Sequence, residues 1–345
     1  MNIVMVLLGI IPLIYTLLAG LRGSMITDFV QMAMILIIGI VVIPWVVSVA
    51  GGFEAVSKGM GGIANNRNIF DPKIAYSFGI VTSIGLIAGS INDQQYWQRS
   101  FAIDKNNLKK AFFWGGILFG IVPIGMSILG FLAANSDLGI KMPEGVQLPM
   151  IGIALVSKLL PAWATLLFAI MLLSGLSSTL DSGLCAGASL WAIDTMKTSE
   201  KEKEILRKEK LGLSLSDEED KVKTDLDKKT PRRARQAMFV LVVVGILVAV
   251  AVENIPGFGL DKLWWVFNGI ASMTVVPTIL SLYWDRQSIK GVLLGFLFSF
   301  IGIIFFIAGN ALGNNDMVIW SGIGIICISL IMNFAFPSKE RFVIK

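Results

Sequence analysis

Apolar runs of about 20 residues recur along almost the whole chain and constrain its fold more than any other sequence feature. A helix of this length spans roughly 30 Å, which is the thickness of the hydrocarbon core of a bilayer. We predict nine such segments, at residues 3–19, 26–50, 74–91, 109–134, 162–194, 236–253, 263–284, 290–310 and 317–336. The pattern therefore predicts an all-α, polytopic membrane protein with about nine transmembrane helices.

The composition supports this class and argues against catalysis. Hydrophobic residues make up 55% of the chain and charged residues only 15%, which is unlike a soluble domain. The sequence contains no histidine, the commonest general base and metal ligand. Cys185 and Cys327 both lie in apolar segments and are interpreted as buried thiols. Because no nucleophile–base, metal-binding or phosphate-binding motif is present, we expect neither an enzyme nor a bound cofactor.

The basic residues follow alternate predicted spans and so predict an orientation in the cell membrane. Lysine and arginine mark the cytoplasmic side of membrane proteins. The N-terminus is therefore expected outside and the C-terminus in the cytoplasm. The net charge of +5 lies mainly in these loops, so it indicates orientation and not binding to nucleic acid. The residues that support this are Arg22, Arg99, Lys105, Lys109, Lys110, Arg232, Arg233, Arg235, Arg286, Lys290, Lys339, Arg341 and Lys345.

The expected topology also suggests that spans precede residue 1. An external N-terminus on a short span without a basic flank inserts poorly by itself. Residues 1–345 are thus expected to form a single transmembrane transporter domain, the C-terminal portion of a larger protein. Within it, residues 196–235 form a charged cytoplasmic loop, expected to be a solvated and partly disordered connector. A binding tail is the alternative for this loop.

An oxygen-rich stretch interrupts the fifth predicted span. At helical spacing Gly175, Ser178, Thr179 and Ser182 share one face, and Asp181 lies at its edge. Polar atoms at membrane depth are costly and usually line a pathway or bind something. The alternative is helix packing at small residues, with the hydroxyls bonded to the preceding turn. The neighbouring carboxylate favours a site for a hard cation such as Na⁺.

Asp28 is a second carboxylate close to membrane depth, at the start of an otherwise uncharged span. It is expected to face a water-filled path, to pair with a cation or to cap a helix N-terminus. From this residue alone, capping and ion binding remain equally open.

Candidate solute contacts follow from the third and seventh predicted spans. Glycine-interrupted spans are where transporters unwind a helix and expose its backbone, although glycines also permit close helix packing. The third span contains Gly79, Gly85 and Gly89. The aromatic residues beyond it are interpreted as a ligand platform or an interfacial belt, and Arg99 as a cytoplasmic anchor. Asn268 either contacts the solute or ties helices together. The predicted solute contacts are Asn92, Gln95, Tyr96 and Asn268.

Taken together, these motifs resemble the sodium:solute symporter family, which includes sodium/proline, sodium/glucose and sodium/sialic-acid transporters. The resemblance covers nearly the whole chain, and Ala19 replaces the first glycine of a family glycine pair. The matching residues are Tyr15, Thr16, Gly20, Arg22, Thr27, Asp28 and Gln31, then Trp97 to Ala102, then Ser178, Thr179, Asp181, Ser182 and Asp194, and finally Pro277, Tyr283, Trp284, Arg286 and Gly291.

The resemblance implies a leucine-transporter-type fold of two inverted five-helix repeats, incomplete at its N-terminus. The nine spans would be core helices four to ten plus two C-terminal helices. The Gly175 carbonyl with the Ser178 and Thr179 hydroxyls would supply half of the main sodium site. Asp28, Ser178, Asp181 and Ser182 would match a second cation site found in some members. Some of those members carry serine where this chain has Asp181.

The predicted function is sodium-coupled symport of a small polar organic solute by alternating access. Proton coupling is one alternative, and a non-transporting membrane subunit or sensor of the same fold is another. The expected partners are the solute, the sodium ion and the lipid bilayer. The missing helices would come from the full-length protein or from another chain.

Overall fold

The computed structural model describes residues 2–62, 68, 71–72, 75, 79–140, 150–195, 200–255 and 260–341. These residues are helical, with no strand among them, and they include seven helices long and apolar enough to cross a membrane. Contacts divide the chain into two compact units. Unit 1 comprises Met1–Asn65 and Gln98–Ala251, and unit 2 comprises Asn66–Trp97 and Val252–Lys345. The prediction of a polytopic all-α membrane protein is confirmed, whereas the number nine and the inverted repeat stay predictions.

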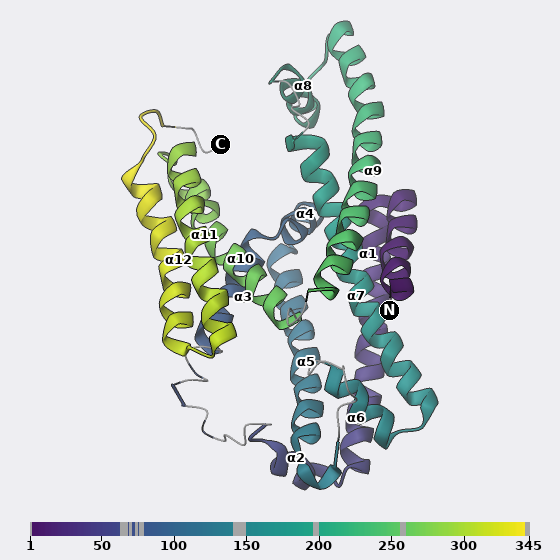
Figure 1. Ribbon diagram of the computed structural model, residues 1–345. Coiled ribbons are helices and arrows are strands. Elements are labelled where there is room, and N and C mark those ends of the chain that lie inside the picture. The colour runs from purple at the N-terminus through teal and green to yellow at the C-terminus, as the bar shows by residue number, and fades with distance from the viewer. Residues whose placement is uncertain are drawn as a thin grey trace. The chain divides into compact units, whose positions relative to one another are not determined.

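Helix α1 (Asn2–Val49) contains the first two predicted spans as two helical segments that meet at Gly20. The helix is interrupted only at Gly20, whose φ of 57° and ψ of −149° are not helical. Glycine adopts positive φ without steric cost because it has no Cβ atom. The two predicted spans are therefore separate helical segments, and the chain reverses direction between them at Gly20 without a long loop (Figure 1).

The core of unit 1 forms where four helices pack against the C-terminal half of α1 (Figure 1). They are α2 (Gly52–Gly59), α5 (Leu108–Ala134), α6 (Ile151–Leu159) and α7 (Ala162–Ser189), and α7 continues as a π-helical turn, Leu190–Thr195. Phe168 and Val46 are fully buried in this core. A Cβ atom at Gly59 would lie 1.8 Å from the carbonyl oxygen of Phe131, so α2 approaches α5 too closely for any other residue. The predicted spans 109–134 and 162–194 agree with α5 and α7.

Helices α8 (Glu200–Lys210) and α9 (Asp217–Glu253) complete unit 1. Ion pairs join them, Lys208 to Glu219 and Lys223 to Glu209. Ser216 and Glu219 form a reciprocal capping box at the start of α9, each side chain accepting a hydrogen bond from the other's backbone N–H. The expectation of a partly disordered connector is thus wrong for residues 200–210 and 217–235. Mixed charges at helical spacing produce paired helices here, and α9 begins well before the predicted span 236–253.

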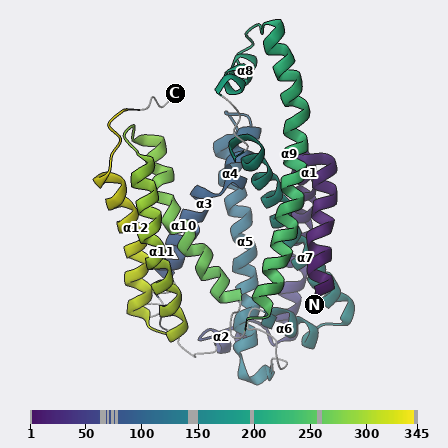
Figure 2. The ribbon, with the colours of Figure 1, turned by 45° about the horizontal axis from the view of Figure 1, so that its top comes forward.

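Unit 2 contains α3 (Val81–Asn92), α10 (Leu260–Tyr283), α11 (Ile289–Leu312) and α12 (Asn315–Ala335). Figure 2 shows α11 and α12 side by side as a hairpin. Added Cβ atoms at Gly291, Gly302 and Gly309 would lie 3.1 Å or less from atoms of α12, so these glycines permit close packing of the two helices. The last three predicted spans agree with α10, α11 and α12 within a few residues.

The third predicted span, 74–91, is described only in part, because residues 74 and 76–78 lie outside the described residues. Helix α3 runs unbroken through Gly85 and Gly89, so unwinding at these two glycines is wrong. The chain breaks instead at Asp93, whose backbone is extended, and α4 (Gln94–Ala102) begins directly afterwards. The Asp93 carboxylate accepts a hydrogen bond from the backbone N–H of Gln95, which caps the new helix.

Candidate functional site

Unit 1 holds a polar cluster where α1 packs against α7. The segment of α1 after Gly20 runs antiparallel to α7 (Figure 1), with one apolar core cluster near Val46 and Phe168 and a second near Leu13 and Cys185. The polar residues lie between these two apolar clusters. We define the polar cluster as Tyr15, Ser24, Thr27 and Asp28 of α1, Arg99 of α4, and Ser178, Asp181 and Ser182 of α7.

Asp181 is the most deeply buried member of the polar cluster, with an exposed fraction of 0%. Its carboxylate accepts hydrogen bonds from the hydroxyls of Tyr15 at 2.6 Å and Ser24 at 2.8 Å. The hydroxyls of Thr27, at 3.1 Å, and Ser182, at 3.0 Å, complete the set. All four donors are neutral, and no cation pairs with Asp181 among the described residues. The negative charge of Asp181 is therefore solvated by hydroxyls but not neutralised.

Asp28 forms an ion pair with Arg99 inside unit 1. Its side chain is 19% exposed and that of Arg99 is 27% exposed. Asp28 also accepts a hydrogen bond from the Ser178 hydroxyl, and Arg99 donates to the Ser182 hydroxyl. Asp28 lies inside α1, far from Asn2, so the capping interpretation is wrong. Arg99 is part of this cluster and pairs with Asp28, a contact that its interpretation as a cytoplasmic anchor did not include.

Gly175 and Thr179 of the predicted main sodium site lie outside the polar cluster. The Thr179 hydroxyl donates to the Gly175 carbonyl oxygen at 3.1 Å, which is a bond within one helix. Thr179 is exposed, whereas Ser178, on the neighbouring face, points toward α1. The predicted cation ligands are thus divided, since Asp28, Ser178, Asp181 and Ser182 come together and Gly175 and Thr179 do not join them.

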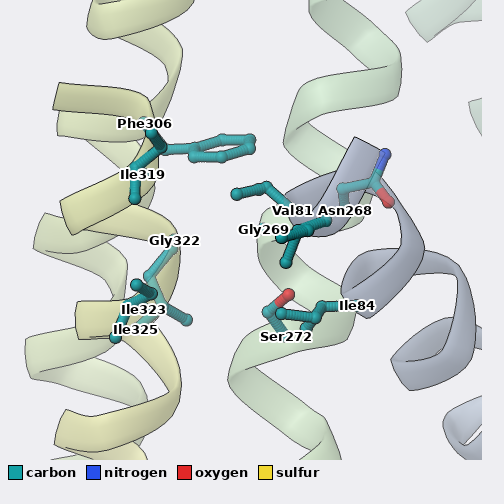
Figure 3. A pocket seen from close by; sticks show the side chains of 11 residues that line it. Val81, Ile84, Asn268, Gly269, Ser272, Phe306, Ile319, Gly322, Ile323 and Ile325 are labelled. Atoms are coloured by element: carbon teal, nitrogen blue, oxygen red, sulfur yellow. The ribbon is translucent and has the colours of Figure 1, made fainter. Parts of the chain in front are cut away.

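Two predicted solute contacts lie where α3 packs against α10 in unit 2. The Asn92 amide donates to the carbonyl oxygen of Ala271 at 2.8 Å and to the Thr274 hydroxyl at 2.9 Å. The Asn268 amide donates to the Trp264 carbonyl oxygen of its own helix. Figure 3 shows this amide beside the ribbon of α3, where a Cβ atom at Gly85 would lie 2.2 Å from its oxygen. The hydrogen bonds of Asn92 thus join α3 to α10, whereas that of Asn268 stays within α10.

A cavity of about 100 Å³ adjoins Asn268, and it is bounded by α3, α10, α11 and α12 (Figure 3). Apart from Asn268 and Ser272, its walls are hydrocarbon or glycine, with Phe306, Ile319 and Ile325 among them. Pockets for small molecules usually measure about 300–1,000 Å³ and carry several convergent polar groups. The cavity is therefore too small and too apolar for a polar organic solute.

The other two predicted solute contacts, Gln95 and Tyr96, lie in the first turn of α4. Tyr96 is 45% exposed, and Gln95 is partly buried. Neighbouring Trp97 donates its indole N–H to the carbonyl oxygen of Ile91 at 2.7 Å, across the break at Asp93. Gln95 and Tyr96 are thus held on a short helix directly after a break in the chain.

Sequence reasoning gave no role to four members of the polar cluster. Tyr15 and Thr27 were recognised only as family motif residues, and Arg99 carried the motif signal but was assigned to the membrane surface. Ser24 carried no signal at all, because a lone serine in a membrane helix usually bonds to its own backbone. What joins them is the packing of α1 against α7, with α4 alongside.

Comparison with known families decides the class of this protein. A sequence model of the sodium:solute symporter family matches residues 1–215, which is more than half of the chain. The chain belongs to the sodium:solute symporter family. No curated protein matches it in a sequence search. The family match includes every residue of the polar cluster.

Membership in the sodium:solute symporter family, with seven membrane-capable helices, identifies a multi-pass membrane protein of a transporter family and not of an enzyme family. It indicates sodium-coupled solute transport, with Na⁺ as the coupling ion. Among the residues that the structure describes, no group of three or more His, Cys, Asp or Glu side chains could hold a metal ion.

Proposed function

We propose that this protein is a sodium-coupled symporter of a small polar organic solute, and that the polar cluster binds the coupling ion during alternating access. The observation that carries the proposal is the unneutralised, fully buried carboxylate of Asp181. Intramembrane carboxylates are rare and usually mark ion pathways. The proposed membrane orientation has the N-terminus outside and the C-terminus in the cytoplasm.

The charges of the polar cluster support binding of one monovalent cation. Asp28 and Asp181 carry two negative charges, and Arg99 carries one positive charge. Their sum is −1, since the Asp28–Arg99 pair is neutral by itself. A buried charge without a partner is unfavourable by several kcal/mol, roughly, so a cation beside Asp181 would stabilise the cluster. Hydroxyl and carboxylate oxygens are hard ligands suited to such an ion.

A neighbouring orphan oxygen strengthens the case for a cation at Asp181. The side-chain carbonyl oxygen of Gln31 is buried and has no hydrogen-bond partner in the described part of the chain. Gln31 lies beside Tyr15, which donates to Asp181. An unsatisfied buried acceptor is costly, so this oxygen is available to a cation or to a water molecule that accompanies it.

The main sodium half-site implied by the family resemblance would use the other face of α7. The Gly175 carbonyl and the Thr179 hydroxyl are bonded to each other, and Thr179 is exposed. The hydroxyl of Ser178 lies between this face and Asp28, to which it donates. We propose that Ser178 links the two cation positions, and that ligands from another helix complete the site at Thr179.

In this mechanism, Na⁺ favours whichever state of the transporter supplies more of its ligands. Binding in the outward-open state stabilises the arrangement of α1 and α7 that accepts solute. The membrane potential then drives release to the cytoplasm, with about 2.3 kcal/mol per charge for each 100 mV. Gln95 and Tyr96 are the better candidates for solute contact, because Asn92 bonds to α10 and the Asn268 amide bonds to the backbone of its own helix.

Sodium-stimulated uptake into vesicles by the full-length protein tests this proposal. The double variant Ser178→Ala/Thr179→Ala should raise the sodium concentration needed for half-maximal uptake steeply. Ser189→Ala is the matched control, since within the described residues its hydroxyl bonds only to the Ala186 carbonyl oxygen, one turn earlier on the same helix. An unchanged sodium requirement in the double variant overturns the assignment. Competition by a panel of amino acids, carboxylates and urea-like compounds would identify the solute class.

Proton coupling is the second candidate, and the same carboxylate favours it. A proton on Asp181 would neutralise the polar cluster without any metal ion. In that case a pH gradient would drive uptake at fixed or zero sodium, and Asp181→Asn would abolish the dependence on pH. If Na⁺ is the coupling ion, Asp181→Asn weakens the sodium dependence and leaves any pH dependence unchanged.

A further inference from the structure

The charges of α9 are segregated along the helix. Its first turn is acidic, with Asp217, Glu218, Glu219 and Asp220. From Lys228 to Val252 the sequence contains no Asp or Glu but five basic residues, all of them between 228 and 235. The apolar run 237–252 follows directly and is roughly 24 Å long as a helix. The basic segment therefore lies at the point where α9 enters the membrane.

Three of these basic residues form a stripe on one exposed face of α9. Lys228, Arg232 and Arg235 are spaced by four and three residues, so they lie above one another on the helix. All three side chains are exposed, and no ion pair involves them within the described ranges. Phe239, 59% exposed, continues the same face into the apolar part of the helix.

This stripe ends in a shallow groove of about 710 Å³ between α9 and α1. Leu17 and Leu18 of α1 form one wall, and Leu18 is 80% exposed. The other wall belongs to α9 and consists of Arg235, Gln236, Phe239 and Val240. The two helices lie side by side in both Figure 1 and Figure 2, and their side chains meet farther along, where Gly9 faces Val242 and Ile246.

Neither wall of the groove supplies a negative charge. Residues 1–27 of α1 contain no Asp or Glu, and neither does α9 between Lys228 and Val252. The groove thus has apolar walls that suit a hydrocarbon chain, and the charged residues at its rim are all basic. An amphiphile with a hydrocarbon chain and an anionic head matches both features, whereas a soluble anion matches only the rim.

We propose that the groove between α1 and α9 binds one anionic phospholipid. The acyl chain lies along Leu17, Leu18, Phe239 and Val240, and the headgroup phosphate contacts Arg232 and Arg235. Arginine suits this role because its planar guanidinium donates two parallel hydrogen bonds to phosphate oxygens. Basic clusters next to a membrane span attract anionic headgroups in the same way. The bound lipid would fix the position of α9 against α1, beside the polar cluster.

The full-length protein, purified in detergent and titrated with phosphatidylglycerol, tests this proposal by native mass spectrometry. We expect one phosphatidylglycerol to bind at low lipid ratios and phosphatidylcholine to bind far more weakly. The variant Arg232→Gln/Arg235→Gln should bind phosphatidylglycerol roughly 30-fold more weakly. The control Arg207→Gln/Lys221→Gln also removes two exposed cations, but away from the groove, and should bind within about twofold of the wild type.

A second variant tests the groove without changing any charge. Leu18→Trp/Val240→Trp fills the groove at two exposed positions, so the fold should be kept and lipid binding lost. Inorganic phosphate at millimolar concentration should not displace the lipid. Equal weakening by the control variant, equal binding of phosphatidylcholine or full displacement by phosphate would each overturn the proposal. A lipid-free dimer that forms through this face would also overturn it, because a second copy would then be the occupant.

Discussion

The α1–α7 pair and the α11–α12 pair are both built from long apolar helices, yet different chemistry holds each pair together. Glycines on α11 let it approach the backbone of α12, and Ser299 donates to a carbonyl oxygen of α12. The α1–α7 pair instead holds one buried and one partly buried carboxylate between two apolar clusters, with an arginine from α4 beside them. Close packing alone is sufficient for helix association in a membrane. The charges between α1 and α7 are therefore not required to join helices, which favours a functional role for them.

The largest expected effect comes from breaking the one ion pair of the polar cluster. Arg99→Leu leaves Asp28 partly buried beside the unneutralised Asp181, so we expect a loss of about 3 kcal/mol in the free energy of unfolding. Thermal unfolding in detergent would measure it. The double variant Arg99→Leu/Asp28→Leu should regain much of this stability but should not transport.

Lys110→Leu is the control for that experiment, because Lys110 is exposed and has no ion pair in the part of the chain described. The prediction is contradicted if Arg99→Leu lowers the free energy of unfolding by no more than Lys110→Leu does. It also fails if the double variant is no more stable than Arg99→Leu alone.

A second prediction concerns the glycine-packed pair. Gly291→Leu should destabilise the protein by about 2 kcal/mol, because its Cβ atom would lie 3.1 Å from the Asn333 Cα atom and from the Met332 carbonyl oxygen. Gly324→Leu is the matched control on α12, since no atom lies within 4 Å of an added Cβ there. Equal melting temperatures for the two variants would show that close packing does not stabilise α11 against α12.

A smaller effect is expected where α3 packs against α10. Asn92→Ala removes two hydrogen bonds to α10, so the unfolding free energy should fall by roughly 1 kcal/mol. The apparent KM for the solute should stay within about twofold of the wild type if Asn92 only ties the helices together. A large rise in KM with unchanged stability would instead support the predicted solute contact.

The smallest effect lies outside the membrane, in the α8–α9 hairpin. The ion pair with Lys208 holds the pKa of Glu219 below its ordinary value of 4.5, and the backbone N–H of Ser216 adds to this. A lowered pKa stabilises the hairpin above pH 4.5 and loses that contribution as the pH falls through the lower, folded-state pKa.

Hydrogen exchange of α8 and α9, corrected for intrinsic rates, should therefore show less protection in acid. Glu219→Gln should remove this dependence of protection on pH, whereas Glu218→Gln, one residue away and exposed, should keep it. If both variants respond to pH as the wild type does, Glu219 does not stabilise the hairpin.

Helix positions were the most predictable part of this fold, because a run such as 109–134 or 290–310 is long and apolar on every face. The predicted helix boundaries were wrong where they depended on a loop or on charge patterning and not on hydropathy. No long polar loop separates the first two predicted spans, so the reversal of the chain (Figure 1) depends on the backbone conformation of a single residue, Gly20. Charge patterning predicted a connector at 196–235, but residues 200–210 and 217–235 are helical, with ion pairs between the two helices and a capping box at the start of α9.

The candidate site was predictable only along single helices. Ser178, Asp181 and Ser182 are neighbours on one helix, so their spacing is sufficient to group them. Asp28 was recognised as a membrane carboxylate, but its partner was not, because Arg99 is 71 residues away in sequence. Asn92 and Asn268 were predicted to contact the solute, but in the structure their amides donate hydrogen bonds to backbone carbonyl oxygens of α10.

The sequence by itself determined that this chain is a polytopic membrane protein with an oxygen-rich helix, because hydropathy and helical spacing are local properties. Only the tertiary structure decided which charge meets which: Arg99 pairs with Asp28, while Asp181 is surrounded by hydroxyls from α1 and α7. The physical reason is that the free energy of a buried charge depends on the groups that packing brings within hydrogen-bond distance. Those groups come from segments far apart in the chain, so no local sequence pattern predicts which of them come into contact.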